Sequence, residues 1–282
     1  MRGRASLELV VRPFDYRTAA DFWGLIDNPQ AAFEHYAFVG GTPAYLGFAA
    51  GARPRGGDVN SWVRRRLLEP ASALFREGRI VVTEDDALAD QRLFWGLLGA
   101  IATGARRWSD IGRVLEVSAN TLRTALTTVI DAGWVAQRND PIRSQRSTYE
   151  LLEPLVRFNR LIIEPNEHHL NSGLAERVWR DARPLVASSI MAPQLEQLAW
   201  EWSLLHANTD TLGGRASAVG PTSLPRPVVG HESAAPMSRW SICTASITAS
   251  RSLRRDRTEH RSAPHQREAV HVRVVGLSPC RR

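Results

Sequence analysis

Four carboxylates in one short stretch are the clearest candidates for acid–base chemistry. They are Glu84, Asp85, Asp86 and Asp90. The stretch precedes a strongly apolar segment that begins near Leu93, and negative charge is stabilising at the N-terminus of a helix. We therefore expect these side chains to serve the start of that helix. No serine, histidine and aspartate grouping stands out elsewhere, so the sequence predicts no catalytic residues.

Two adjacent histidines, His168 and His169, follow Glu167 and raise the question of a metal site. Neighbouring residues on a helix point about 100° apart, and the sequence lacks the H-E-x-x-H spacing of zinc-binding helices. This pattern favours a solvated polar loop. The only cysteines, Cys243 and Cys280, lie near the end of the chain and cannot form a cysteine zinc cluster. We expect neither a metal nor a cofactor.

The chain contains no lysine, so all 36 of its basic residues are arginines. A phosphate-binding loop of the type G-x-x-x-x-G-K-[ST] needs a lysine that reaches the nucleotide phosphates, and Schiff-base catalysis needs an amine. The pair Gly40–Gly41 is therefore expected to form a turn and not a phosphate cradle. These features argue against an enzyme.

A third set of polar residues suits contact with DNA. Residues 119–132 have the spacing of a helix with one apolar side, and the opposite side is polar. The candidates are Asn120, Thr121, Arg123, Thr124 and Thr127 on that helix, with Arg138, Arg143 and Arg146 after it. Such a helix can enter a major groove while the later arginines meet phosphates. The helix carries only one arginine, however, which leaves packing against another protein domain as an open alternative.

The segments on either side of residues 119–132 complete a larger unit. An apolar helix is expected to end at Gly104, and the helix 119–132 to end at Gly133. Ser109 and Ser118 are expected to cap the two later helices. The stretches "WVAQR" and "STYELL" then have the composition of two strands around the loop "NDPIR". This order predicts a winged helix-turn-helix.

Helical spacing extends over most of the remaining chain up to residue 210, so the predicted fold class is mainly α. Asp15 is expected to cap an early helix, after a short strand near the start. In the later helices we expect a buried set, which is Trp179, Leu185, Leu195, Leu198 and Trp202. Most tryptophans are expected to lie in the core and not to stack on single-stranded nucleic acid.

The charge of +7 belongs to the last part of the chain. Residues 211–282 hold 12 arginines against four acidic residues, whereas residues 1–210 hold 24 arginines against 25 acidic residues. Trp240 is the only aromatic residue after residue 210, and the segment is rich in serine, proline and arginine. We expect residues 211–282 to be disordered. The basic charge is therefore no evidence that the folded part binds nucleic acid.

The sequence has no run of about 18 apolar residues that could span a membrane, and its start lacks the pattern of a secretory signal. We expect a cytoplasmic protein without membrane contact.

Several phrases resemble the carboxyl half of the archaeal-type AAA-related ATPases of prokaryotes. These phrases are "GRASLELVVRPFDYRTAADFW", "YAFVGGTPAYL", "YELLEPLVRF" and "VWRDARPLVASSIMAPQLEQLAWEW", together with the predicted winged helix. Family members share a P-loop ATPase domain, a small helical lid, a winged helix and a terminal restriction-endonuclease-like domain. The resemblance covers residues 3–210 and rests on the order of several loose motifs.

The resemblance implies four parts. They are a remnant ATPase strand with a helical lid-like region (residues 1–89), a winged helix (90–163), a helical linker or the start of a nuclease-like domain (164–210), and a disordered Arg/Ser/Pro-rich tail (211–282). Relatives place their nucleotide-binding motifs upstream of the point that corresponds to Gly3, and their nuclease-like domain uses a carboxylate-x-lysine pair. We therefore expect a truncated ATPase-family chain without an ATP site or a nuclease site. A shifted reading frame or a diverged end is our hypothesis for the tail.

The expected function is DNA binding through the winged helix, within residues 118–146. An alternative is a protein-interaction module that docks a separately encoded ATPase half or another partner. A non-functional gene remnant is the third possibility.

Overall fold

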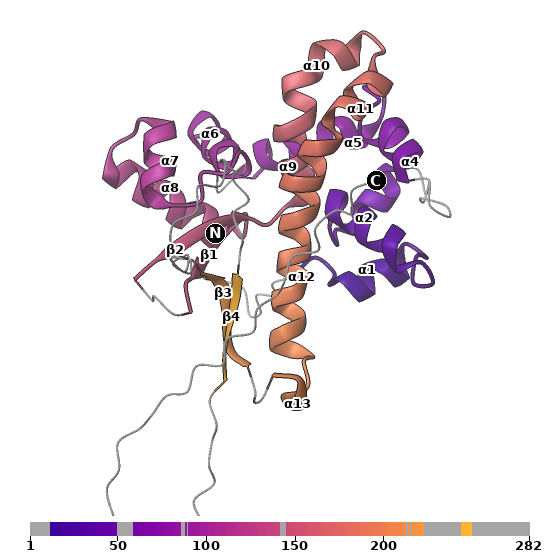
Figure 1. Ribbon diagram of the computed structural model, residues 1–282. Helices are drawn as coiled ribbons and strands as arrows, with labels where there is room; N and C mark the ends of the chain where they lie inside the picture. Colours follow the sequence, from indigo (N-terminus) through magenta and orange to yellow (C-terminus); the bar gives the residue numbers. More distant parts are fainter. Residues whose placement is uncertain are drawn as a thin grey trace, which may run out of the picture. The chain divides into compact units, whose positions relative to one another are not determined.

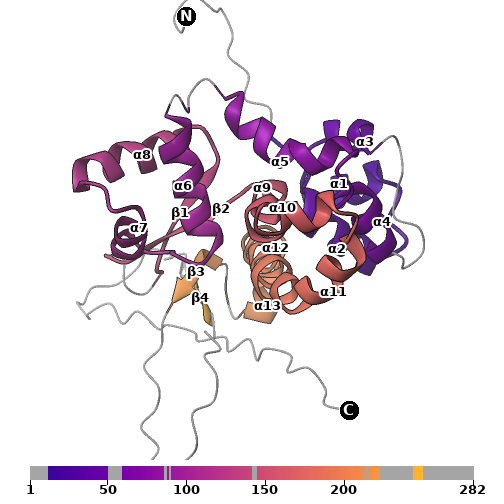
Figure 2. The ribbon, with the colours of Figure 1, turned by 90° about the horizontal axis from the view of Figure 1, so that it is seen from above.

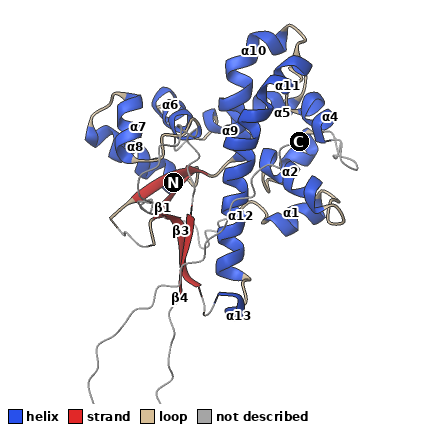
Figure 3. Cartoon of the chain, viewed as in Figure 1, coloured by secondary structure: helices blue, strands red, loops and turns tan. Residues whose placement is uncertain are grey.

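The computed structural model describes residues 12–49, 59–85, 88, 90–141, 145–212, 214, 216–222 and 244–249. The chain is mainly helical, as the sequence predicts, and strands are few (Figure 3). It divides into two compact units, one of Met1–Ala136 with Glu150–Leu195, and one of Gln137–Tyr149 with Glu196–Arg282. Across the described residues, no helix is both long and apolar enough to cross a membrane.

The first unit begins with five helices. They are α1 (Tyr16–Phe22), α2 (Pro29–Val39), α3 (Ala44–Phe48), α4 (Val59–Arg66) and α5 (Ala73–Thr83). Asp15 caps α1 as predicted, because its carboxylate accepts a hydrogen bond from the Thr18 amide at 2.8 Å. Gly40, with φ +65°, ends α2 in the predicted glycine turn. Helices α1, α2 and α4 pack together (Figure 2).

A buried histidine lies at the centre of this helical cluster. The ring of His35 is 3.8 Å from the Trp23 ring and 4.7 Å from the Trp62 ring, centroid to centroid. His35 is only 2% exposed, and its Nε2 atom has no hydrogen-bond partner. Burial lowers the pKa of His35 to about 3, so the ring is neutral at physiological pH. It acts as a core aromatic residue.

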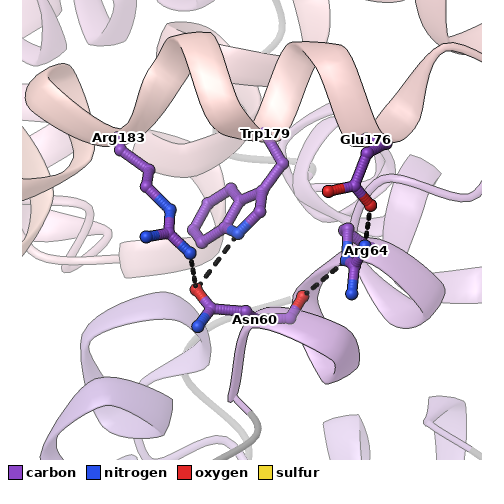
Figure 4. Close-up of polar contacts among 5 residues, drawn as sticks. All are labelled: Asn60, Arg64, Glu176, Trp179 and Arg183. Carbon is purple, nitrogen blue, oxygen red and sulfur yellow. Dashed lines mark hydrogen bonds and ion pairs between the residues drawn. The ribbon is translucent and has the colours of Figure 1, made fainter.

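Polar contacts join α4 to the later helix α11 (Ala175–Val186), as Figure 4 shows. The Asn60 side-chain oxygen accepts hydrogen bonds from Trp179 Nε1 at 3.2 Å and from an Arg183 guanidinium nitrogen at 2.9 Å. Arg64 donates to the Asn60 carbonyl at 3.3 Å and forms an ion pair with Glu176. The Asn60–Trp179 hydrogen bond joins residues that are 119 positions apart in the chain. Such long-range packing cannot be specified by local helix propensity.

Three helices and a strand pair follow α5. They are α6 (Gln91–Ala102), α7 (Trp108–Leu115), α8 (Ala119–Asp131), β1 (Val135–Asn139) and β2 (Ser147–Leu151), with β1 beside β2 (Figure 1). Gly104 and Gly133 have positive φ values of 108° and 83° and lie just beyond the ends of α6 and α8, as predicted. Ser118 caps α8 as predicted.

One predicted cap is wrong. Ser109 lies inside the first turn of α7, which begins at Trp108. The N-cap is Arg107, whose backbone is extended at φ −109° and ψ 152° and whose side chain makes no capping hydrogen bond. The helix therefore starts without the side-chain acceptor that a serine cap supplies.

Two long helical segments complete the body. The first runs through α9 (Pro154–Phe158), the π-helix η1 (Asn159–Ile163) and α10 (Glu164–Asn171). The second runs through α11, the π-helix η2 (Ala187–Met191) and α12 (Ala192–Leu205). The predicted polar loop at His168 and His169 is wrong in shape, because α10 continues directly from η1; both histidines are nevertheless exposed, as expected.

The predicted buried set in α11 and α12 is only partly correct. Trp179 is buried at 5% exposure. Leu185, Leu195 and Trp202 are exposed at 41%, 57% and 51%, which contradicts the prediction. On α12 the buried tryptophan is Trp200, 7% exposed, and not Trp202, which lies on the other side of the helix.

The segment predicted to be disordered contains regular structure in the parts that are described. Beyond the short α13 (Thr209–Leu212), β3 (Ala216–Thr222) pairs antiparallel with β4 (Thr244–Ala249), with Val219 opposite Ile247. β-Branched residues favour such pairing, and low aromatic content alone does not exclude it. The other residues of the predicted tail, and the predicted strand before Arg12, lie outside the described residues.

Candidate nucleic-acid interface

Helix α8 separates its apolar and polar side chains onto opposite sides. The buried residues are Leu122, Ala125, Leu126 and Val129. The predicted DNA-contacting residues of this helix are Asn120, Thr121, Arg123, Thr124 and Thr127, and all five are exposed. Four of these five recur at intervals of three and four residues, so they share one side of the helix. We call these five residues the α8 polar face.

The start of α8 is held by its cap. The Ser118 hydroxyl accepts a hydrogen bond from the Thr121 amide at 3.1 Å and lies 2.8 Å from the Thr121 hydroxyl. The backbone of Ser118 is extended, at φ −63° and ψ 153°, as N-cap residues usually are. This arrangement fixes the first turn, from which Asn120 and Thr121 project.

Threonine hydroxyls on α8 are used by the helix itself. Thr124 Oγ1 donates to the Asn120 carbonyl at 3.1 Å, and Thr128 Oγ1 donates to the Thr124 carbonyl at 3.0 Å. The hydroxyl hydrogens of Thr124 and Thr128 are thus used in hydrogen bonds within the helix. Their methyl groups and oxygen lone pairs remain for an outside partner. Methyl groups suit contact with the methyl of thymine, asparagine suits adenine, and arginine suits guanine.

The electrostatics of this face are weak. Arg123 is its only basic residue, and the helix ends at the acidic Asp131. On α7, the guanidinium of Arg113 is paired with Asp110 at 3.2 Å and is therefore partly neutralised. The α8 polar face can offer directional contacts to base edges, but it lacks the charge for strong phosphate binding.

The remaining predicted contacts belong to the second unit. Arg138, on β1, places its guanidinium carbon 5.7 Å from the centroid of the Trp200 ring, a cation–π contact. Arg146 is exposed and precedes β2, and its carbonyl accepts a hydrogen bond from the Asp140 amide at 2.8 Å. Arg143 lies outside the described residues. Arg138 and Arg146 are therefore not members of the α8 polar face.

The four carboxylates predicted to serve the start of α6 do not all do so. Asp90 caps α6 as expected, accepting from the Leu93 amide at 3.1 Å. Asp85 instead accepts a hydrogen bond from Trp134 Nε1 at 2.7 Å, a contact across 49 residues that no local sequence pattern indicated. Glu84 follows the end of α5, and Asp86 lies outside the described residues. Where the structure is described, no cluster of histidine, cysteine or acidic side chains could hold a metal ion.

One carboxylate with a strongly shifted pKa was missed by sequence reasoning. Glu153 caps α9, accepting a hydrogen bond from the Leu155 amide at 3.4 Å and one from the Tyr45 hydroxyl at 3.3 Å. Burial raises the pKa of Glu153 to about 7, against the opposing effect of these hydrogen bonds. A shift of this kind can mark a catalytic acid, but both partners here are structural. The sequence Glu153-Pro154 before an apolar helix was the signal that could have predicted this cap.

Among the described residues, the α8 polar face itself carries amide, guanidinium and hydroxyl groups and no carboxylate. Comparisons with family models, curated proteins and solved structures found no match to this chain.

Proposed function

We propose that α6, α7, α8, β1 and β2 form a winged helix-turn-helix that binds double-stranded DNA, with α8 in the major groove. The observation that carries this proposal is the α8 polar face, in which amide, guanidinium and threonine groups are exposed on one side of a capped helix. About seven residues separate its first and last members, or roughly 10 Å at 1.5 Å per residue. That length covers about three base pairs at 3.4 Å per step.

Phosphate contacts in this proposal come from arginines outside α8. Arg138, Arg143 and Arg146 follow the helix, and the 12 arginines of residues 211–282 add attraction that does not depend on sequence. We further propose kinship with the carboxyl half of the archaeal-type AAA-related ATPases, supported by the order of the motifs described above. The chain has no P-loop lysine, so the proposed activity is binding without hydrolysis by this chain, in the cytoplasm.

Fluorescence anisotropy with the full chain and a duplex enriched from a random pool tests the DNA-binding proposal. Asn120→Ala and Arg123→Ala are expected to weaken binding about 5- to 150-fold each, because each good base contact contributes roughly 1–3 kcal/mol. Arg17→Ala and Asn171→Ala, both exposed and on other helices, are the matched controls. If all four variants bind equally well, α8 does not contact DNA.

The low charge of the α8 polar face supports a second candidate, a protein-interaction module. A face with one arginine and several threonines also suits a partner such as a separately encoded ATPase domain. In that case the α8 variants keep full DNA affinity and lose affinity for the partner. Co-purification with the product of a neighbouring P-loop gene, abolished by Asn120→Ala and Arg123→Ala, would favour this candidate.

A further inference from the structure

Helix α12 exposes a row of large apolar side chains. Leu195, Trp202 and Leu205 are 57%, 51% and 68% exposed, and Leu198 is half-buried. We call these four residues the outer row. They are spaced by three, four and three residues, so they lie along one side of the helix. Helical hydrogen bonding continues past Leu205, because the His206 amide donates to the Trp202 carbonyl at 2.9 Å.

Three of the four residues of the outer row keep more than half of their surface exposed. The opposite side of α12 carries Trp200, 7% exposed, which lies roughly 160° around the helix from Trp202. Contiguous exposed apolar side chains can mark an interaction site. The outer row is therefore a candidate surface for a partner.

The spacing identifies the shape of that partner. Intervals of three and four residues are the a and d positions of a coiled-coil heptad, which pack against another helix with the same repeat. With Leu195 and Trp202 at a, and Leu198 and Leu205 at d, the row extends over two heptads. A second α12 carries the same repeat and is self-complementary in a two-fold arrangement.

The flanking polar side chains favour one alignment. In this heptad Glu201 occupies position g and His206 position e. In a parallel pair, Glu201 of one copy faces His206 of the other, a favourable contact made twice. In an antiparallel pair, Glu201 faces its own equivalent, and like charges in that position are destabilising.

We propose that a second copy of this chain covers the outer row, forming a parallel two-fold pair of α12 helices. The row spans about 15 Å, at 1.5 Å per residue, so the interface is small. Small interfaces are weak, and we expect a dissociation constant on the order of 10–100 µM. This proposal does not depend on DNA binding.

Sedimentation equilibrium of the full chain between about 1 and 300 µM tests the proposal. The unmodified chain is expected to shift from monomer to dimer over this range. Trp202→Glu and Leu205→Glu are expected to weaken dimerisation by at least about 30-fold, because each removes a large apolar side chain of the row and introduces a charge. Val114→Glu, at a residue 59% exposed on α7, is the matched control and should dimerise normally. Circular dichroism checks that every variant keeps its helical content.

A monomer at all concentrations would overturn the proposal, and would mean that another protein or another part of this chain covers the row. Dimerisation that survives both glutamate variants would also overturn it. His206→Glu tests the alignment, because it places a new glutamate opposite Glu201 only in the parallel pair. We expect it to weaken the dimer, and an unchanged dimer would exclude the parallel arrangement.

Discussion

Helices α8 and α12 both carry apolar residues at helical spacing, yet they expose opposite kinds of surface. Helix α8 buries its single apolar side and exposes asparagine, arginine and threonines. Helix α12 buries Trp200 but exposes Leu195, Trp202 and Leu205. A helical repeat of apolar residues therefore does not by itself show that this side of the helix is buried within the chain.

The largest expected difference between the two helices is in stability. Leu126→Ala on α8 removes a side chain that is 2% exposed and should lower the free energy of unfolding by about 2–5 kcal/mol. Leu205→Ala on α12, at 68% exposure, should change it by less than about 0.5 kcal/mol. Urea unfolding at a concentration where the chain is monomeric measures both. Equal losses would mean that the outer row of α12 packs inside the chain.

Buried ionisable side chains differ from exposed ones because they make the free energy of unfolding depend on pH. His35 has a folded-state pKa of about 3, below its ordinary value of 6.5, so the folded state disfavours protonation. Its contribution to stability is complete above pH 6.5 and is lost as the pH falls toward 3, with a slope of about 1.4 kcal/mol per pH unit. His35→Phe should remove this slope. Thermal unfolding between pH 3.5 and 7 compares the two chains, and parallel curves would contradict the burial of His35.

Glu153 should act in the opposite direction. Its folded-state pKa of about 7 lies above the ordinary value of 4.5, so the folded state prefers the protonated form. Its contribution to stability is complete below pH 4.5 and is lost as the pH rises toward 7. Glu153→Gln keeps a neutral side chain and should become relatively more stable than the unmodified chain over this interval. A constant difference between the two melting temperatures would show that Glu153 is solvated.

The smallest expected effect is the difference in stability loss between alanine substitutions at two serines. Ser118→Ala removes the acceptor for the Thr121 amide and should cost about 1 kcal/mol. Ser109→Ala, inside the first turn of α7, should change the stability little, because Ser109 is not the N-cap. Chemical denaturation of the two variants side by side provides the measurement. A larger loss of stability for Ser109→Ala than for Ser118→Ala would mean that Ser109 caps α7.

Local signals in the sequence were sufficient for α8 and its neighbours. The cap at Ser118, the stop at Gly133 and the two strands after it depend on residues close together in the chain, and the structure has each of them. The Asp85–Trp134 hydrogen bond and the Glu153–Tyr45 pair join residues far apart in sequence, so no local pattern could reveal them. The same limit applies to α12, because helical spacing predicted that Leu195 and Trp202 are buried, whereas long-range packing buries Trp200.

The β3–β4 pair shows a different limit. The prediction of disorder after residue 210 came from a composition rich in Ser, Pro, Gly, Ala and Arg, without a sustained repeat and with one aromatic residue. The described strands β3 and β4 are the part that differs from it, because small and β-branched residues suffice for pairing. The composition of residues 211–282 as a whole therefore did not reveal the local strand preference of β3 and β4.

Selection of DNA from a random duplex pool tests the role of the α8 polar face most directly. The full chain should enrich a motif that includes about three consecutive specified base pairs, and Asn120→Ala should lose preference at one of them while keeping the others. The Asn171→Ala control should enrich the same motif as the unmodified chain. Enrichment of no motif, or of an identical motif by Asn120→Ala, would contradict the reading of DNA by α8.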